Sequence, residues 1–88
     1  MKVGFRESFA KDLKAVRERA VLDRVRTVIG TVEKAKSLAG FPHLKKLKGH
    51  ENYYRLRIGN YRIGLALDGD VAIFVRCLNR KDIYKYFP

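Results

Sequence analysis

The residues in this sequence with the clearest chemical potential are arginines in its C-terminal half. Residues 53–78 alternate between apolar and polar side chains with a period of two, which is typical of β-strands, and the alternation puts arginines on one face of the predicted sheet. The planar guanidinium fork suits a phosphate group, and repulsion between neighbouring guanidinium groups falls when an anion binds between them. Because no acidic residue occurs from Asn52 through Leu67, we predict that this face binds a phosphate backbone. The arginines concerned are Arg55, Arg57, Arg62 and Arg76.

The turn between the first two of these strands fixes how the arginines are placed. Gly59-Asn60 is a two-residue hairpin signal, and a turn there puts Arg57 opposite Arg62. The same register leaves only apolar side chains and tyrosines on the other face. Tyr53 lies on the arginine face, where its ring can stack on a base, although packing against arginine stems is an equally good interpretation.

The next turn, in residues 68–70, allows two registers. A two-residue loop at 68–69 puts Phe74 on the apolar face, whereas a three-residue loop puts the alternate residues of 71–77 there. We predict the three-residue loop because it separates apolar from charged side chains, and a slip by one residue turns every side chain to the other face. This register puts Arg76 opposite Arg62 and leaves Phe74 on the arginine face.

A second group of reactive side chains follows the last strand. Arg80 and Tyr84 are four residues apart, so on a helical turn they share one side, at the rim of the arginine face. The alternative interpretation is a frayed terminal turn in which Tyr84 packs as an amphipathic plug. The loop over 43–50, which precedes the strands, is also basic, and we expect Lys45, Lys46 and Lys48 to contact the same polyanion.

The elements that must position these residues are a helical hairpin and a small sheet. Residues 6–39 carry two apolar stripes whose centres differ by roughly 140° on a helical wheel, so one straight helix cannot turn both toward one core. We therefore predict a break near 19–22, between helices over about 6–19 and 21–38, the second closed by Gly40. Residues 2–5 suit an edge strand. The predicted fold is α+β, a helical hairpin packed on a small, mostly antiparallel sheet in the order β-α-α-β-β-β, with a short C-terminal segment.

Length and charge limit the class of protein. The chain has 88 residues, enough for a single domain over 1–88, and it carries 20 Lys and Arg against 9 Asp and Glu, a formal net charge of +11. Such a charge favours a polyanionic partner. No apolar run reaches the roughly 18–20 residues of a membrane span, and one cysteine with two histidines gives too few ligands for a classical zinc site. We expect a cytoplasmic protein with no cofactor, no metal and no membrane partner.

Three segments of the chain together resemble the RelE/ParE superfamily of bacterial type II toxins. They are Leu47-Lys48-Gly49, the run 54–62 (YRLRIGNYR) and the run 79–84 (NRKDIY). The resemblance extends over nearly the whole chain and implies a toxin of the RelE branch, with a fold like that of microbial ribonucleases. Such a toxin cleaves mRNA in the ribosomal A site without a metal, by attack of the 2′-hydroxyl on the adjacent phosphate. The implied partners are the ribosome, mRNA and a cognate antitoxin from a neighbouring gene.

The same resemblance implies roles for individual residues. Arg62 and Arg80 would stabilise the charge that builds up in the transition state, and Tyr84 would orient the nucleotide at the cut or transfer a proton. These three are the predicted catalytic residues. The predicted RNA-binding residues are Arg55, Arg57, Arg76, Tyr53, Lys45, Lys46 and Lys48.

The sequence departs from the superfamily pattern at the groups that transfer protons. Well-studied relatives have lysines in place of Arg55 and Arg57, and others have a histidine where Asn79 stands, whereas arginine is a poor base. His50 is the nearby imidazole that the sequence offers, but the favoured interpretation is a surface loop histidine, so the general base stays open. Two other functions also stay open: gyrase inhibition of the ParE kind, without catalysis, and plain binding of RNA or the ribosome.

Overall fold

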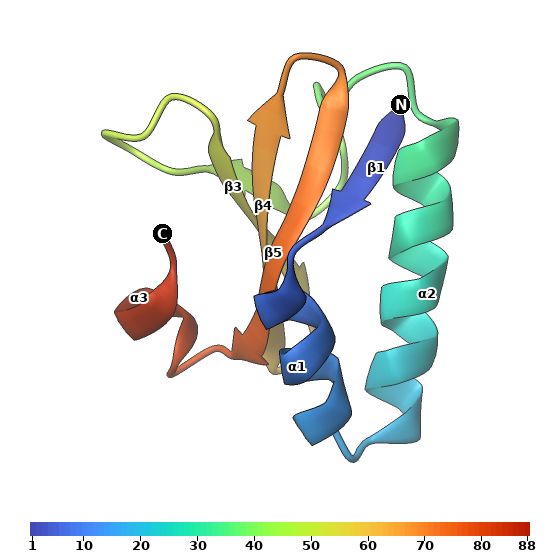
Figure 1. The fold of residues 1–88 in the computed structure, drawn as a ribbon, viewed down its shortest axis with the longest axis vertical. Coiled ribbons are helices and arrows are strands. Elements are labelled where there is room, and N and C mark those ends of the chain that lie inside the picture. Colours follow the sequence, from blue (N-terminus) through green and yellow to red (C-terminus); the bar gives the residue numbers. More distant parts are fainter.

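The computed structural model describes residues 1–88 as a five-stranded sheet with two helices on one face and a short third helix on the other (Figure 1). The strands are β1 (Lys2–Phe5), β2 (Leu44–Lys46), β3 (Tyr53–Ile58), β4 (Tyr61–Asp68) and β5 (Val71–Asn79). The helices are α1 (Glu7–Ala15), α2 (Arg19–Lys34) and α3 (Ile83–Tyr86). The sheet order is β1-β5-β4-β3-β2; β1 is parallel to β5 and the other pairs are antiparallel. The predicted α+β class, with a helical hairpin on a mostly antiparallel sheet, is confirmed.

The helical hairpin is present, but both of its predicted boundaries were wrong. The chain leaves α1 at Val16, which is extended and buried, so the break comes at residues 16–18 rather than 19–22. Helix α2 ends at Lys34, and Gly40 does not close it. Val32 and Leu38 are both buried. If the helix continued to Leu38, the two side chains would point about 120° apart around the helix axis. An extended segment after Lys34 lets both side chains enter one core. None of the three helices is long and apolar enough to cross a membrane.

The main core lies between the two long helices and the sheet. The predicted pairing of β3 with β4 is confirmed, because Ile58 is opposite Tyr61 and Arg57 is opposite Arg62. The apolar side of this hairpin therefore faces the helices and the arginine side faces away from them. The buried residues of the main core are Phe9, Val16, Val25, Val32, Leu38, Leu56, Ile58, Ile63, Leu65, Ala72, Phe74 and Cys77.

The predicted register of β5 was wrong. The turn is a two-residue loop at Gly69-Asp70, and an extra residue bulges out of β5 opposite the step between Gly64 and Leu65. Phe74 is consequently fully buried in the main core, and its ring centre lies 5.4 Å from that of Phe9. In a regular strand, residues three apart point to opposite faces of the sheet. The extra residue in the bulge reverses the alternation after it, so that Phe74 and Cys77 both face the helices. Of the residues predicted for the apolar face in this strand, Cys77 alone is fully buried; Val71, Ile73 and Val75 are half-buried.

The short strand β2, which was not predicted, lies in the segment predicted to be a basic loop. It pairs antiparallel with β3, with Leu44 opposite Leu56 and Lys45 opposite Arg55. Leu44 contacts the main core, while Lys45 and Lys46 are exposed. Three residues are too few to show an alternating pattern in the sequence, and lysines are common on edge strands because they discourage pairing with another chain.

A second, smaller core lies on the opposite face of the sheet and fixes the C-terminal tail. It consists of the buried side chains Leu47, Ile83 and Phe87. The Phe87 ring lies directly on Gly64 of β4, where an added Cβ atom would come within 2.6 Å of the ring. Position 64 therefore has to be glycine for the tail to dock in this way. The small core decides where α3, and with it Tyr84, sits relative to the arginine face.

Candidate functional site

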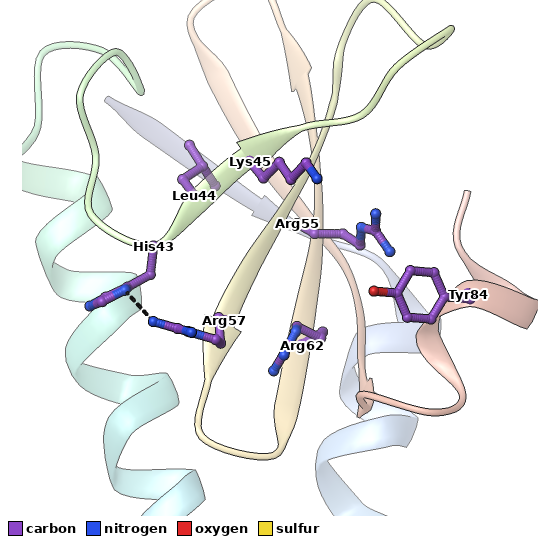
Figure 2. A pocket seen from close by; sticks show the side chains of 7 residues that line it. All are labelled: His43, Leu44, Lys45, Arg55, Arg57, Arg62 and Tyr84. Carbon is purple, nitrogen blue, oxygen red and sulfur yellow. Dashed lines mark hydrogen bonds between the residues drawn. The ribbon is translucent and has the colours of Figure 1, made fainter.

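A cavity of about 330 Å³ opens on the arginine face, between β2, β3, β4 and α3. No acidic side chain lines it. Figure 2 shows Arg57 pointing toward His43, Arg55 pointing toward Tyr84, and Arg62 between them. The lining residues are His43, Leu44, Lys45, Arg55, Arg57, Arg62 and Tyr84. Three guanidinium groups and an ammonium group thus surround one hollow, which makes it a site for an anion.

Arg62 is held in place by backbone carbonyl groups. Its Nη1 donates to the carbonyl oxygen of Gly59 at 3.0 Å and to that of Tyr61 at 2.9 Å. Both acceptors belong to the β3–β4 turn, so the turn fixes the guanidinium group as well as the register. The neutral carbonyl groups leave the positive charge uncompensated. Arg62 is therefore a preorganised donor, the property required to stabilise developing negative charge.

Arg57 is held by His43 through two contacts. The backbone N–H of Arg57 donates to the His43 carbonyl oxygen at 3.1 Å, and Arg57 Nη2 lies 3.2 Å from His43 Nδ1. Since a guanidinium group can only donate, Nδ1 is the acceptor in this contact. His43 also has a positive φ of 64°, which is uncommon for a residue with a side chain and which recurs at functional sites.

Arg55 forms a stacked pair with Tyr84 across the cavity mouth. Its Cζ lies 4.4 Å from the centre of the Tyr84 ring, within the range of a cation–π interaction. The ring is 68% exposed, and its hydroxyl points into the cavity in Figure 2. The flanking residues Ile83 and Phe87 are buried, so α3 presents Tyr84 from an anchored segment rather than from a frayed end.

Arg76 does not lie with the other arginines. Its Nε and Nη2 donate to the two carboxylate oxygens of Asp12 in α1, at 2.7 and 3.0 Å, and Asp12 also accepts the backbone N–H of Cys77. The hydrogen bond to Asp12 is the main cause that raises the pKa of Arg76. The predicted pairing of Arg76 with Arg62 was wrong, because the bulge shifts Arg76 opposite Gly64. This arginine fastens α1 to β5 and lines no cavity with the others.

The remaining predicted residues do not line the cavity. Arg80 is exposed, and its backbone N–H donates to the Asn60 carbonyl oxygen at 2.8 Å, so it lies beside the β3–β4 turn. The Tyr53 ring packs edge-on against Phe87, with centres 5.6 Å apart, over the smaller core. Lys46 and Lys48 are exposed along the β2 edge. Of the predicted set, the cavity brings together Arg55, Arg57, Arg62, Lys45 and Tyr84.

Sequence reasoning missed His43. It singled out His50, whose ring instead lies 5.7 Å from that of Tyr53 and does not line the cavity. The signal that could have found His43 is the edge strand: because Leu44 pairs with Leu56, the preceding histidine comes level with Arg57. Without β2 there was no reason to place the two side chains together.

Comparisons with known proteins give matches that extend over nearly the whole chain. Residues 3–84 match the model of the family described as "ParE toxin of type II toxin-antitoxin system, parDE". Toxin RelE3 of Methanocaldococcus jannaschii is 47% identical over 89 residues, covering 100% of both chains. A chain in the crystal structure of the RelB–RelE antitoxin–toxin complex from Methanococcus jannaschii is 45% identical, with a TM-score of 0.83, covering 97% of this chain and 99% of that one. YafQ from E. coli strain BL21(DE3) shares the fold at 13% identity, with a TM-score of 0.74 and coverage of 94% and 97%.

Proposed function

The chain belongs to the ParE toxin family of type II toxin–antitoxin systems, and we propose that it is a ribosome-dependent endoribonuclease that cleaves mRNA in the ribosomal A site. The observation that carries this proposal is the cavity that Arg55, Arg57, Arg62 and Tyr84 line together, with no acidic side chain among them. A surface that served only for binding a protein would have no need of this convergence of cations on one hollow. The similarity to a toxin named RelE3 supports the cleaving branch of the superfamily over the gyrase-directed one.

The partners follow from the charge and from the relatives. A net charge of +11 favours docking on ribosomal RNA, with a strong dependence on salt. A solved relative is bound to an antitoxin named RelB, and we expect this toxin to be neutralised by a cognate antitoxin of its own. We place both the toxin and its target in the cytoplasm.

The proposed reaction is a transesterification within the RNA. The 2′-oxygen attacks the adjacent phosphorus, the bond from phosphorus to the 5′-oxygen breaks, and the products are a 2′,3′-cyclic phosphate and a free 5′-hydroxyl. Negative charge accumulates on the non-bridging phosphate oxygens, where Arg62, Arg55 and Arg57 donate. The backbone N–H of Arg80 bonds to Asn60 in the β3–β4 turn, and we propose that its side chain contacts a flanking phosphate.

Two proton transfers complete the reaction. His43 Nδ1 is the neutral nitrogen acceptor that lines the cavity, since every other nitrogen side chain there is a cation, and we assign it the proton of the 2′-hydroxyl. Arg57 Nη2 lies 3.2 Å from His43 Nδ1, and a phosphate that draws Arg57 toward itself leaves the lone pair of this nitrogen free to accept the proton. The Tyr84 hydroxyl gives its proton to the departing 5′-oxygen and recovers one from solvent. His43 releases the proton of the 2′-hydroxyl to solvent, so both groups return to their starting state. Both steps are general acid–base catalysis, which contributes about 10²–10⁴-fold each.

The proposal is tested with purified toxin, translating ribosomes and a defined mRNA. We expect cuts at fixed positions within codons and 3′ ends that carry a cyclic phosphate, and we expect Arg62→Ala to abolish the cuts. Arg26→Ala is the matched control, because Arg26 is an exposed arginine on α2 that lines no cavity described here. Intact mRNA together with double-strand DNA breaks in cells would contradict the proposal and indicate gyrase inhibition instead.

A further inference from the structure

We propose that Arg24 and Asn60 form a second phosphate subsite, which extends the RNA track from the cavity of Figure 2 across the β3–β4 turn to helix α2. This inference rests on the proposed function and specifies the path of the RNA beyond the first cavity. Its ligand is the backbone phosphate adjacent to the one held at Arg57. Contacts of this kind position an RNA without reading its sequence.

The subsite is a separate hollow next to the first. Its volume is about 390 Å³, and it is lined by Arg24, His43, Arg57, Gly59 and Asn60. None of these side chains is acidic or apolar, so the lining offers hydrogen-bond donors and positive charge and little else. The guanidinium group of Arg24 lies against the turn, where a Cβ atom added to Gly59 would be 3.4 Å from Arg24 Nη1. The left-handed backbone of Gly59, with a φ of 54°, therefore serves both the hairpin turn and the close approach of an arginine from another element.

The charge of Arg24 is not compensated within the protein. The three ion pairs of the structure are Lys11 with Glu7, Arg19 with Asp23, and Arg76 with Asp12. Arg24 is in none of them, although its neighbour Asp23 is acidic. Two guanidinium groups, from Arg24 and Arg57, thus share one hollow with no counter-charge, and an anion between them relieves their repulsion.

The two hollows are adjacent, because Arg57 and His43 line both of them. A strand with one phosphate in the first hollow therefore has its next phosphate within reach of the second, on the far side of Arg57. This direction leads away from Tyr84, which closes the other end of the first hollow. The track thus runs from α3 over β3 to α2, and Arg57 is shared by two successive phosphates.

The test measures binding of 2′-O-methyl oligoribonucleotides, which lack the attacking hydroxyl and cannot be cleaved. Chains of two to six nucleotides are titrated by fluorescence anisotropy at several salt concentrations. We expect Arg24→Ala to weaken binding of the longer chains about five- to tenfold and to reduce the slope of log affinity against log salt by about 0.7, the value for one phosphate contact on a single strand. Arg26→Ala removes the same charge from the same helix and is expected to leave the slope unchanged.

Two further comparisons make the test specific. The defect of Arg24→Ala should disappear with the dinucleotide, which has one phosphodiester and fills only the first hollow, and Arg24→Lys should keep the wild-type salt slope. Equal binding by Arg24→Ala and Arg26→Ala at every length would overturn the subsite, as would an unaltered protein that binds none of the chains. Neither result bears on the cleavage proposal, which is judged by the ribosome assay with Arg62→Ala. Circular dichroism of each variant checks that the fold is retained.

Discussion

Arg55 lies beneath Tyr84, with its Cζ 4.4 Å from the ring centre, and this contact joins the first strand of the hairpin to the last helix of the chain. The two residues are 29 positions apart, so the contact exists only because α3 docks on the sheet. A cation under the ring holds the ring's orientation while the hydroxyl remains free to act. The ring of Tyr84 thus serves for contact with Arg55 and its hydroxyl for chemistry, so substitutions can measure the two roles separately.

Tyr84→Phe is the first test of that separation. The variant keeps the ring over Arg55 and loses the hydroxyl, so we expect kcat for mRNA cleavage to fall about 10²-fold or more with little change in KM. Tyr84→Ala removes the ring as well, and both parameters should change. Single-turnover cleavage on ribosomes measures the difference. A Tyr84→Phe variant as active as the wild type would show that the hydroxyl transfers no proton.

His43→Gln tests the proton acceptor. Glutamine can accept the hydrogen bond from Arg57 but cannot act as a base, so we expect kcat for cleavage to fall about 10²-fold or more with little change in KM. The measurement is single-turnover cleavage on ribosomes. A His43→Gln variant as active as the wild type would exclude His43 as the base. His50→Gln is the matched control, because His50 does not line the cavity.

Gly64→Ala tests whether the tail must dock for activity. The new methyl group meets the Phe87 ring at 2.6–2.8 Å, so we expect α3 to detach and cleavage to fall while the main core stays folded. Phe87→Ala should detach the tail to a similar extent. In the double variant there is no ring to clash with, so Gly64→Ala should add little to Phe87→Ala, a non-additivity that a double-mutant cycle measures. Additive losses would mean that Gly64 matters for another reason.

Asp12→Ala tests the ion pair that fastens α1 to β5. The carboxylate accepts two hydrogen bonds from Arg76 and one from the Cys77 backbone, in a half-buried setting, so its removal should lower the free energy of unfolding by about 3 kcal/mol. Urea titration measures this loss. Asp23→Ala is the control. Asp23 Oδ1 lies 4.0 Å from Nε of Arg19 and both side chains are exposed, and such surface pairs contribute about 0–1 kcal/mol.

Cys77 predicts how stability depends on alkaline pH. Burial raises the pKa of its thiol from the ordinary 9.0 to about 12, and the nearby Asp12 carboxylate adds to the rise. The folded protein therefore holds the thiol proton more tightly than the unfolded chain. The free energy of unfolding should fall as the pH rises from about 9 toward 12, because ionisation of the unfolded thiol favours unfolding. Cys77→Ala should show a shallower decline over the same range in urea titrations.

The sequence predicted the parts of the fold that short-range patterns determine. The β3–β4 hairpin follows from a period of two and a Gly59-Asn60 turn, and so do three of the cavity's arginines. The alternation of Val71, Ile73 and Val75 was misleading, because burial of the large Phe74 ring against Phe9 outweighs it and a bulge absorbs the mismatch. The positions of His43 and Arg24 could not be predicted for another reason. That of His43 depends on a three-residue strand, and that of Arg24 depends on how α2 packs beside a turn.

The sheet separates two cores of very different size, twelve buried residues on one face and three on the other. The large core sets the stability of the molecule, whereas the small one sets the fraction of molecules whose Tyr84 is in place. Each loss of about 1.4 kcal/mol in the small core raises the detached fraction tenfold while the rest of the protein stays folded. Substitutions in three residues can therefore adjust the potency of the toxin in graded steps without affecting its abundance.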